Sequence, residues 1–494
     1  MSSLGTSPEL EAWERRRDSR VGRVLARTSS RSLLQEAVTA LRGLVAWRGA
    51  GVATNPDCAS LRRALQTGAF ETADRILRER AEDLEARAAV LIEAMLVVGR
   101  RDEALKVASQ HRLRLERTDR GVAMLELLHL GSAGARLPSG RVNCLGLDRA
   151  IQRGELDVCD MTKQLRWLGW RASSIVDLDL LLFNAARRSD PSAALRFLRR
   201  YFAAYRLPSE RLRWHEPAEE GALPSLDFGW HAKHRGSPLV SVLVAARNAA
   251  PTVISAIGSL LAQSYEPLEV LVADDASQDG TLEAIRKEYR ADPRVRVFAS
   301  RVNQGPYNIK NALSEHARGE LLAFHDADDL ALPFRIAHQV AELRREARIG
   351  CVAHGLRLRP NGTFVFFKDQ RATRISPVSL VLRRDTFHRV GRFRSAWIGA
   401  DGELQAKLVH LYGSRAIKCL REPLTVSSWG ARSITRAAGT ESLEDGYRSP
   451  SRRAYSQLVA LSFALGAAPS DVAIQARLRE TNNWAEPHPV EELT

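Results

Sequence analysis

Two patterns of apolar residues divide the chain into a helical part and an α/β part. In residues 51–213, apolar positions recur at the three- and four-residue spacing of amphipathic helices. From Leu239 onward, short apolar runs alternate with amphipathic stretches, which is typical of strands alternating with helices. Such alternation indicates a mostly parallel sheet with helices on both faces. We therefore predict a multidomain protein, in which an all-α helical-repeat domain precedes a Rossmann-like α/β domain.

Changes in composition predict the boundaries of five segments. They are a basic N-terminal segment (1–50), the helical domain (51–213), a Pro- and Gly-rich linker (214–237), the α/β domain (238–435), and a C-terminal helix and tail (436–494). Residues 32–47 have helical spacing and are read either as the first core helix or as an amphipathic helix on a membrane surface. We expect the C-terminal helix to pack on the α/β domain and the tail, which carries no motif, to be mobile.

The helical domain carries a degenerate repeat. The spacing Ala64-x3-Gly68-x4-Ala73 returns 31 residues later as Met95-x3-Gly99-x4-Ala104, and a poorer third copy ends at Ala194. A period in the low thirties resembles tetratricopeptide-like repeats, which bind partners or dock on a neighbouring domain. A protein partner on these helices is therefore one expectation, and a plain helical domain without a ligand is the alternative.

Composition limits the classes of function. The net charge is +15, with basic residues spread along the whole chain and without a nucleic-acid-binding motif, so we expect anionic partners but no nucleic acid. The five cysteines are scattered without metal or disulfide spacing. No apolar run approaches the roughly 20 residues of a membrane span, and the N-terminus does not resemble a secretory signal. We expect a cytoplasmic protein, with peripheral membrane contact as an alternative.

Acidic clusters follow two of the predicted strands. Asp274-Asp275 begins the segment "DDASQDGT", and Asp326-Ala-Asp328-Asp329 follows the apolar run Leu321 to Phe324. The carboxyl ends of parallel strands meet at one edge of a sheet, where ligands bind. Carboxylates there can accept hydrogen bonds from a nucleoside, and a hard divalent cation would relieve the repulsion among them. Taken singly, each cluster is also explained by a helix cap or a solvated turn.

Four ordered segments of the α/β domain resemble the family 2 glycosyltransferases of the GT-A fold. These segments are "VSVLVAARN", "VADDASQDGT", "NQGPYNIKNAL" with "GELLAFHDADD", and "LRRDTFHRVGRF" with "GADGELQAKL". The resemblance covers roughly residues 238–435. It implies an inverting, metal-dependent transfer of one sugar from a nucleotide-diphosphate sugar, usually linked to UDP, to a hydroxyl of a glycan or lipid-linked acceptor. Bacterial surface polysaccharide assembly is the usual setting of the family.

The resemblance also implies roles for individual residues. Asp401 stands at the position of the catalytic base, and Asp326 and Asp328 form the DxD pair that holds Mn²⁺ or Mg²⁺. The donor nucleotide would contact residues that end the first, second and fourth strands, together with one lysine: Ala245, Arg247, Asn248, Asp274, Asp275, Lys310 and Asp326. Four further residues are candidates for the acceptor side: His354, Arg384, Glu403 and Trp429.

Other interpretations stay open at this point. His325, which precedes the DxD pair, is expected in the core or behind the site. Trp397 and Trp429 serve either as sugar-stacking platforms or as core residues. For the whole chain, one alternative is a non-catalytic helical-repeat scaffold with a degenerate transferase domain, and another is a nucleotidyltransferase on a similar fold. The absence of a QxxRW-like sequence argues against a processive polysaccharide synthase.

Overall fold

The computed structural model of the protein describes most of the chain after residue 87. The described residues are 88–117, 119–128, 143–156, 177–216, 222–230, 233–345, 348–367, 369–430, 433–436, 448–464, 478–479, 483 and 485–493. The predicted basic segment, its helix at 32–47 and the first repeat copy at 64–73 lie outside these ranges. The two later repeat copies lie inside them.

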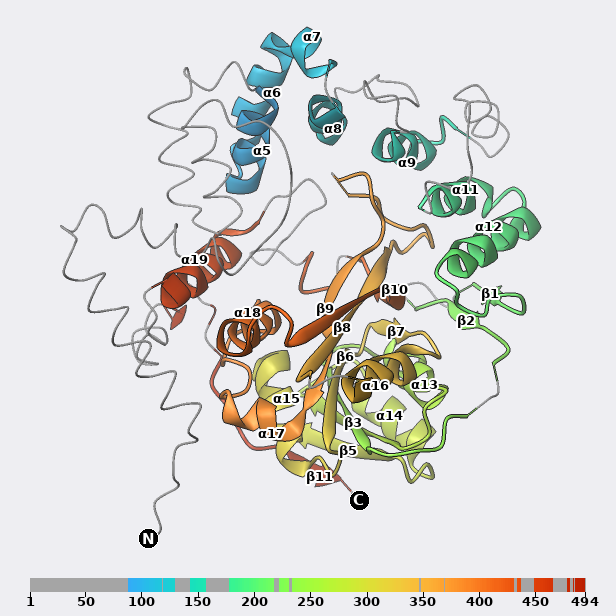
Figure 1. Ribbon diagram of the computed structural model, residues 1–494, viewed down its shortest axis with the longest axis vertical. Helices are drawn as coiled ribbons and strands as arrows, with labels where there is room; N and C mark the ends of the chain where they lie inside the picture. Colours follow the sequence, from blue (N-terminus) through green and yellow to red (C-terminus); the bar gives the residue numbers. More distant parts are fainter. Residues whose placement is uncertain are drawn as a thin grey trace, which may run out of the picture.

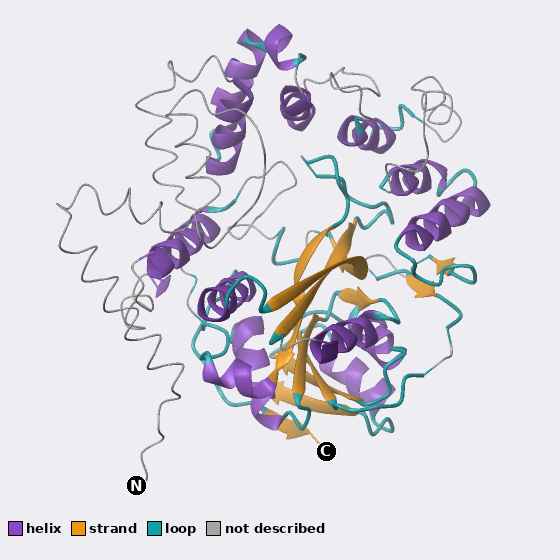
Figure 2. Ribbon diagram, viewed as in Figure 1, coloured by secondary structure: helices purple, strands orange, loops and turns teal. Residues whose placement is uncertain are grey.

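Short helices form an arc above one end of a large sheet (Figures 1 and 2). Gly99, with a φ of +86°, makes the turn between the first two, and Asp190 caps α12 by accepting from the Ala193 amide at 2.9 Å. Helix pairs therefore stand at the second and third predicted copies, while a helical-repeat domain stays a prediction. The helices are α5 (Ala88–Val98), α6 (Arg101–Gln110), α7 (Arg112–Leu115), α8 (Asp119–Leu127), α9 (Cys144–Gln152), α11 (Leu178–Ala186) and α12 (Pro191–Ala204).

The predicted linker contains a small two-stranded sheet, in which β1 (Arg213–His215) pairs antiparallel with β2 (Ser225–Asp227). Beyond it, the described residues form a nine-stranded mixed sheet in the order β11-β5-β4-β3-β6-β9-β8-β10-β7. Its strands are β3 (Val240–Ala246), β4 (Leu268–Asp275), β5 (Val295–Ser300), β6 (Leu321–Asp326), β7 (Asp329–Ala331), β8 (Gly350–Leu358), β9 (Arg374–Arg383), β10 (Ile417–Ser428) and β11 (Glu491–Leu493).

Helices cover both faces of this sheet, as the alternation predicts. The side chains of β3 point alternately into two cores: Val242 and Val244 face the one that α13, α14 and α16 complete, and Leu243 faces the other. The first core is continuous with that of the helical part of the chain. The helices are α13 (Val253–Leu261), α14 (Thr281–Tyr289), α15 (Gly305–His316), α16 (Arg335–Arg345), α17 (Arg384–Arg389), α18 (Ala400–Tyr412) and α19 (Pro450–Ala464).

The C-terminal residues correct one expectation. Helix α19 packs against α18 through Tyr455, as expected, but the tail beyond it is not free: β11 adds an antiparallel edge strand to β5. Ion pairs from Glu491 to Arg301 and from Glu492 to Arg296 accompany this pairing. A three-residue strand carries too short a pattern to be recognised in a sequence. Among the described helices, none is long and apolar enough to cross a bilayer.

Candidate active site

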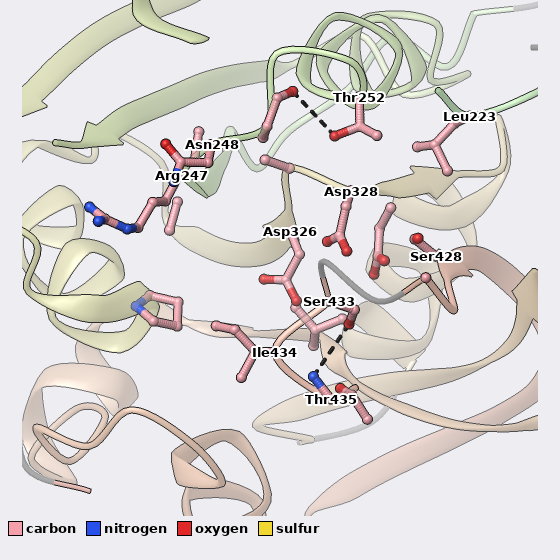
Figure 3. Close-up of a pocket in the computed structure, with 18 of the residues that line it drawn as sticks. Leu223, Arg247, Asn248, Thr252, Asp326, Asp328, Ser428, Ser433, Ile434 and Thr435 are labelled. Carbon is pink, nitrogen blue, oxygen red and sulfur yellow. Dashed lines mark hydrogen bonds between the residues drawn. The ribbon is translucent and has the colours of Figure 1, made fainter. Parts of the chain in front are cut away.

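The carboxyl ends of three neighbouring strands meet at one pocket. Ala246 at the end of β3 is in register with Asp274 of β4, and Ala245 is in register with Asp326 of β6. The pocket has a volume of about 630 Å³, within the usual range for a small-molecule site. In the close-up of Figure 3, Asp326 and Asp328 point into the same space, with Arg247 and Asn248 to one side and Ser428 to the other.

The turn after β3 is held by the segment that follows β4. The Asn248 amide donates to Ser277 Oγ at 3.0 Å, and Asn248 Oδ1 accepts from the Gln278 amide at 2.9 Å. Arg247 reaches across to the backbone carbonyl of Asp275. Asn248 has a φ of +46°, a left-handed conformation that asparagine tolerates better than most residues. The two segments therefore form one rigid side of the pocket, on which Ala245, Arg247 and Asn248 lie as predicted.

Asp274 and Asp275 are both buried but differ in what they contact. Asp275 lines the pocket, and its two oxygens accept from the amides of Gln304 and Gly305 at 2.8 and 2.9 Å. Burial raises the pKa of Asp275, although these hydrogen bonds oppose the change. Asp274 does not line the pocket; its Oδ2 accepts from the Ser277 amide, and its buried Oδ1 has no hydrogen-bond partner. Asp275 thus anchors the start of α15, and Asp274 keeps one unsatisfied oxygen.

The acidic turn between β6 and β7 concentrates negative charge at the pocket. Lys310, which is almost fully buried, forms an ion pair with Asp326. Burial alone would raise the pKa of Asp326, but the Lys310 ammonium holds it below its usual value. Burial and the neighbouring Asp326 raise the pKa of Asp328 to about 6. The pKa of Asp329 is raised well above its usual value by burial and then by Asp328, and its carboxylate accepts from Ser427 Oγ.

A buried arginine, which the sequence did not single out, supports this turn from behind. Arg335 of α16 is fully buried and donates to His325 Nδ1 at 3.0 Å and to the Phe324 carbonyl at 2.7 Å. Because His325 Nδ1 accepts, its Nε2 carries the proton and donates to the Asp329 carbonyl at 3.0 Å. This confirms His325 as a residue behind the site. The only signal for Arg335 was its spacing of four residues from Gln339, to which it also donates.

Asp401 lies where the resemblance places a base. It occupies the first turn of α18, whose N-terminus favours a negative charge, and it lines the pocket. Tyr307 donates its hydroxyl to Asp401 Oδ1 at 2.9 Å, and the Gly402 amide donates to the same oxygen at 2.8 Å. Among the described residues, none donates a hydrogen bond to Asp401 Oδ2. Burial, and then the charge of Asp401, raise the pKa of Tyr307 well above its usual value, so the phenol stays protonated as a donor.

The four acceptor candidates do not line the pocket, and each has a different role. Glu403 is buried in an ion pair with Arg394 at 2.6 Å and accepts from Tyr455, so it joins α18 to α19. Arg384 donates to the Ala317 carbonyl, and His354 lies half-buried within β8. Trp429 is buried against Phe367 and between two arginine side chains. Their residue types suit sugar or phosphate binding, but contacts with residues far away in the sequence hold these side chains outside the pocket.

Trp397, in contrast, lines the pocket, with its ring against the start of α15. A Cβ atom on Gly305 would lie 2.8 Å from that ring, and the φ of Gly305 is +80°, so a glycine is required there. The backbone amides of Trp397 and Ile398 both donate to Asn483 Oδ1, at 3.1 and 3.0 Å. The C-terminal segment thereby holds the loop that leads into Asp401.

The carboxylates of the acidic turn fit a hard divalent cation in chemistry. Asp326 and Asp328 supply oxygen donors that Mg²⁺ and Mn²⁺ accept. Burial raises the pKa of Asp328 most, the charge of Asp326 raises it further, and a cation would relieve that second effect. Within the described ranges, no group of three or more His, Cys, Asp or Glu side chains is arranged to hold a metal ion.

A family model described as Glycosyl transferase family 2 matches residues 241–395. These residues form a family 2 glycosyltransferase domain. The match begins in β3 and ends just before Trp397, so it takes in Arg247, Asp275 and the acidic turn. The glycosyltransferase domain thus carries the pocket residues at the strand ends, whereas Asp401 and Arg452 lie beyond the matched range.

Relatives of the glycosyltransferase domain share the same part of the chain. The putative glycosyltransferase EpsE of Bacillus subtilis (strain 168) is 36% identical over 121 residues, which are 24% of this chain and 43% of EpsE. The succinoglycan biosynthesis protein ExoO of Rhizobium meliloti (strain 1021) is 41% identical over 103 residues, 21% of this chain and 29% of ExoO. This chain therefore spans less than half the length of either relative.

A solved structure, S. aureus TarS 1–349 in complex with UDP-GlcNAc, aligns with 50% of this chain and 72% of its own, with 19% identity and a TM-score of 0.36.

Proposed function

We propose that the protein transfers one sugar from a nucleotide-diphosphate sugar, most simply a UDP-sugar, to a hydroxyl group of a glycan or lipid-linked acceptor. The observation that carries the proposal is the meeting of Arg247, Asp326 and Asp401 in one pocket, within and next to a family 2 glycosyltransferase domain. The name of ExoO, a succinoglycan biosynthesis protein, supports polysaccharide assembly as the setting.

In this proposal the donor lies along the strand ends. Arg247 and Asn248 would contact the nucleoside, and Lys310 would keep Asp326 ionised beside the diphosphate. Asp326 and Asp328 would hold Mn²⁺ or Mg²⁺. When bound, such a cation supplies positive charge that stabilises the departing nucleoside diphosphate. The carboxylates of Asp326 and Asp328 would otherwise repel that product.

Asp401 would act as the general base. Its Oδ1 is occupied by Tyr307 and the Gly402 amide, which fixes the orientation of the carboxylate and leaves Oδ2 open. The acceptor hydroxyl would give its proton to Oδ2 while its oxygen forms the bond to the anomeric carbon. The bond from that carbon to the diphosphate breaks in the same step, so the configuration inverts. A positioned carboxylate of this kind contributes roughly 10²- to 10⁴-fold to rate.

The test is thermal stabilisation of the whole chain by UDP, GDP, CDP and dTDP, each with and without Mn²⁺. A ligand at about 100 times its Kd stabilises the folded state by about 2.7 kcal/mol. We expect one nucleotide to raise the melting temperature in a Mn²⁺-dependent manner, and Asp328→Ala to lose that response. The control is Asp385→Ala, a largely exposed carboxylate of α17 that pairs with Arg389 on the same helix.

Two results would count against the proposal. If no nucleotide stabilises the protein, the donor pocket is absent and the non-catalytic scaffold becomes the better interpretation. If Asp328→Ala and Asp385→Ala respond to Mn²⁺ and nucleotide as the parent protein does, the metal assignment is wrong while the donor pocket stands.

A further inference from the structure

The helical part of the chain is tied to the segment that follows β8. This segment, residues 359–373, leaves the sheet and extends toward the arc of helices α8 to α12 (Figure 1). Its first residues, Arg359, Pro360 and Gly362, line the pocket. One stretch of chain therefore touches both the helices and the proposed active site.

The first attachment is a buried ion pair. Asp148 of α9 is fully buried, and Arg359 donates to it twice, from Nη2 to Oδ2 at 2.7 Å and from Nη1 to Oδ1 at 3.2 Å. Arg359 Nη1 also donates to the Phe364 carbonyl at 2.9 Å, which folds the segment back on itself. Such a paired geometry fixes both the position and the orientation of the guanidinium. Asp148 thus determines where this pocket-lining side chain lies.

The second attachment consists of hydrogen bonds to the backbone of the same segment. Asn184 of α11 donates from Nδ2 to the Phe364 carbonyl at 2.9 Å and accepts from the Phe364 amide at 2.8 Å. The two bonds replace the pairing that a neighbouring strand would supply to a buried backbone. The Phe364 ring packs on that of Phe183, in the core that the helices share with the sheet. The segment therefore cannot move without breaking contacts to the helices.

The third attachment lies at the pocket itself. Gly362 has a φ of +76°, and an added Cβ atom would lie 2.8 Å from the guanidinium carbon of Arg187, at the end of α11. Arg187 also donates to the Asn361 carbonyl and pairs with Glu216. The turn that lines the pocket is thus in direct contact with a helix. Farther along, Asp177 accepts from the Ala372 amide at 3.0 Å, so the far end of the segment is held too.

The order of the strands decides which side of the pocket this wall forms. β4 and β3 lie on one side of β6, and β9, β8 and β10 lie on the other. Because β6 and β8 each pair antiparallel with β9, β8 ends at the same edge of the sheet as β6. The nucleotide candidates Arg247 and Asn248 follow β3, whereas Arg359 follows β8. The wall held by the helices therefore faces the nucleotide side across the acidic turn.

We propose that the helices α9 and α11 are a structural part of the active site: they hold residues 359–362 as the acceptor-side wall of the pocket, with Asp148 as the positioning residue that acts through Arg359. This inference rests on the proposed function, since it needs a donor on the β3 side. It assigns to the helices a role within the catalytic pocket itself, in place of a separate partner-binding array.

The test compares two buried aspartates of the helical part, each of which pairs with an arginine. Asp148→Asn removes the charge that holds Arg359. Asp179→Asn is the control, because Asp179 is buried and pairs with Arg200 of α12 instead of with residues 359–373. Nucleoside diphosphate release, with water as acceptor, is measured on UDP-glucose, UDP-N-acetylglucosamine, GDP-mannose and dTDP-rhamnose, together with nucleotide binding and melting temperature.

Both variants are expected to melt at a lower temperature. For the best donor, we expect Asp148→Asn to lower kcat at least tenfold with the donor KM within twofold, since a displacement of about 1 Å can cost 10²-fold in rate. Asp179→Asn should keep both constants within twofold. Should Asp148→Asn fail to fold, Thr373→Val is the second variant; it removes the bonds of Thr373 to Asp177 and Tyr201 at the far end of the segment. It should lower kcat at least threefold.

The proposal is overturned if the kcat of Asp148→Asn, or of Thr373→Val in its place, matches that of Asp179→Asn. It is also overturned if Asp148→Asn raises the donor KM and lowers nucleotide binding by the same factor as kcat, because the wall would then belong to the donor side. A parent protein that neither binds a nucleotide nor releases one would contradict the proposed function itself, which separates the two failures.

Discussion

Arg247 and Asp326 reach the pocket from the ends of neighbouring strands, whereas Arg359 and Trp397 reach it from segments held by distant parts of the chain. On the strand side, the partners that position each residue lie within about one strand–helix unit, as Asn248 and Ser277 do. On the opposite side, Arg359 pairs with a residue 211 positions away, and Trp397 is held by Asn483, 86 positions away. The strand side is therefore positioned by local contacts, whereas the opposite side is positioned by contacts between distant parts of the chain.

The largest effect should come from Asp401, the proposed base, on the opposite side of the pocket. Asp401→Asn keeps the shape and the Tyr307 hydrogen bond but removes the base, so we expect turnover to fall about 10²- to 10⁴-fold. Nucleotide binding, measured by thermal stabilisation, should stay within twofold of the parent protein. Tyr307→Phe is the control, because it removes only the hydrogen bond to Oδ1 and should have a smaller effect. Equal turnover in Asp401→Asn and the parent would place the base elsewhere.

The next largest effect concerns Arg335, which supports the acidic turn of the strand side from behind. Arg335→Met leaves the acceptors at His325, Phe324 and Gln339 buried without their donor, so we expect a loss of about 3–5 kcal/mol of unfolding free energy. Arg335→Lys keeps the charge but cannot span three acceptors, and should recover part of that loss.

Urea unfolding measures both changes. Arg345→Met on the same helix is the control, since its side chain is 75% exposed and should change stability by no more than about 0.5 kcal/mol. If Arg335→Met is as stable as Arg345→Met, the buried network does not support the acidic turn.

Residues of the strand side could be predicted because their signals are local. An apolar run such as Leu239 to Ala246 predicts a buried strand, and the polar residues that follow it must lie at the carboxyl end. Ala245, Arg247, Asn248, Asp275 and the acidic turn accordingly line the pocket. Asp274 shows the limit of this reasoning, because alternation along β4 turns it away from the pocket and toward Ser277.

On the opposite side, the family resemblance supplied Asp401, but most other residues could not be predicted, because residue type alone does not say where a partner lies. Glu403 looked suitable for an acceptor, but Arg394 and Tyr455 hold it in the core. Arg359 and Tyr307 carried no pattern of their own, and their positions depend on Asp148 and Asp401. The tail, which carries no motif, was predicted to be mobile. Its strand β11 has only three residues, and pairing with β5 determines its register.

A smaller effect should follow from loosening the C-terminal segment. Asn483 is buried, and Asn483→Ala leaves the Ile398 amide without its acceptor, which we expect to cost about 1–3 kcal/mol in urea unfolding. Turnover should fall as well, because Ile398 lies three residues before Asp401. The control in the same segment is Glu491→Gln, whose exposed pair with Arg301 should be worth about 1 kcal/mol or less. Unchanged stability and turnover in Asn483→Ala would show that this segment does not hold the loop.

The smallest effect concerns the pH dependence of the wall that the helices hold. Burial raises the pKa of Asp177 above its usual value of 3.8, and the hydrogen bonds from Thr373 and Ala372 oppose the change only in part. The folded state therefore binds the proton more readily than the unfolded state does. As the pH rises from the unfolded to the folded pKa, the contribution of this carboxyl to stability falls, by at most about 1.4 kcal/mol per pH unit.

Asp177→Asn removes this titration, so the stability of the parent relative to the variant should decline in urea unfolding as the pH rises above 3.8. Asp292→Asn is the control on the strand side, because a hydrogen bond from Arg294 lowers the pKa of Asp292 and places its window below pH 3.8. Its stability difference from the parent should stay level over the same range. If the stability differences of the two variants follow the same pH profile, burial does not raise the pKa of Asp177. The attachment at Thr373 would then be as independent of pH as the strand side.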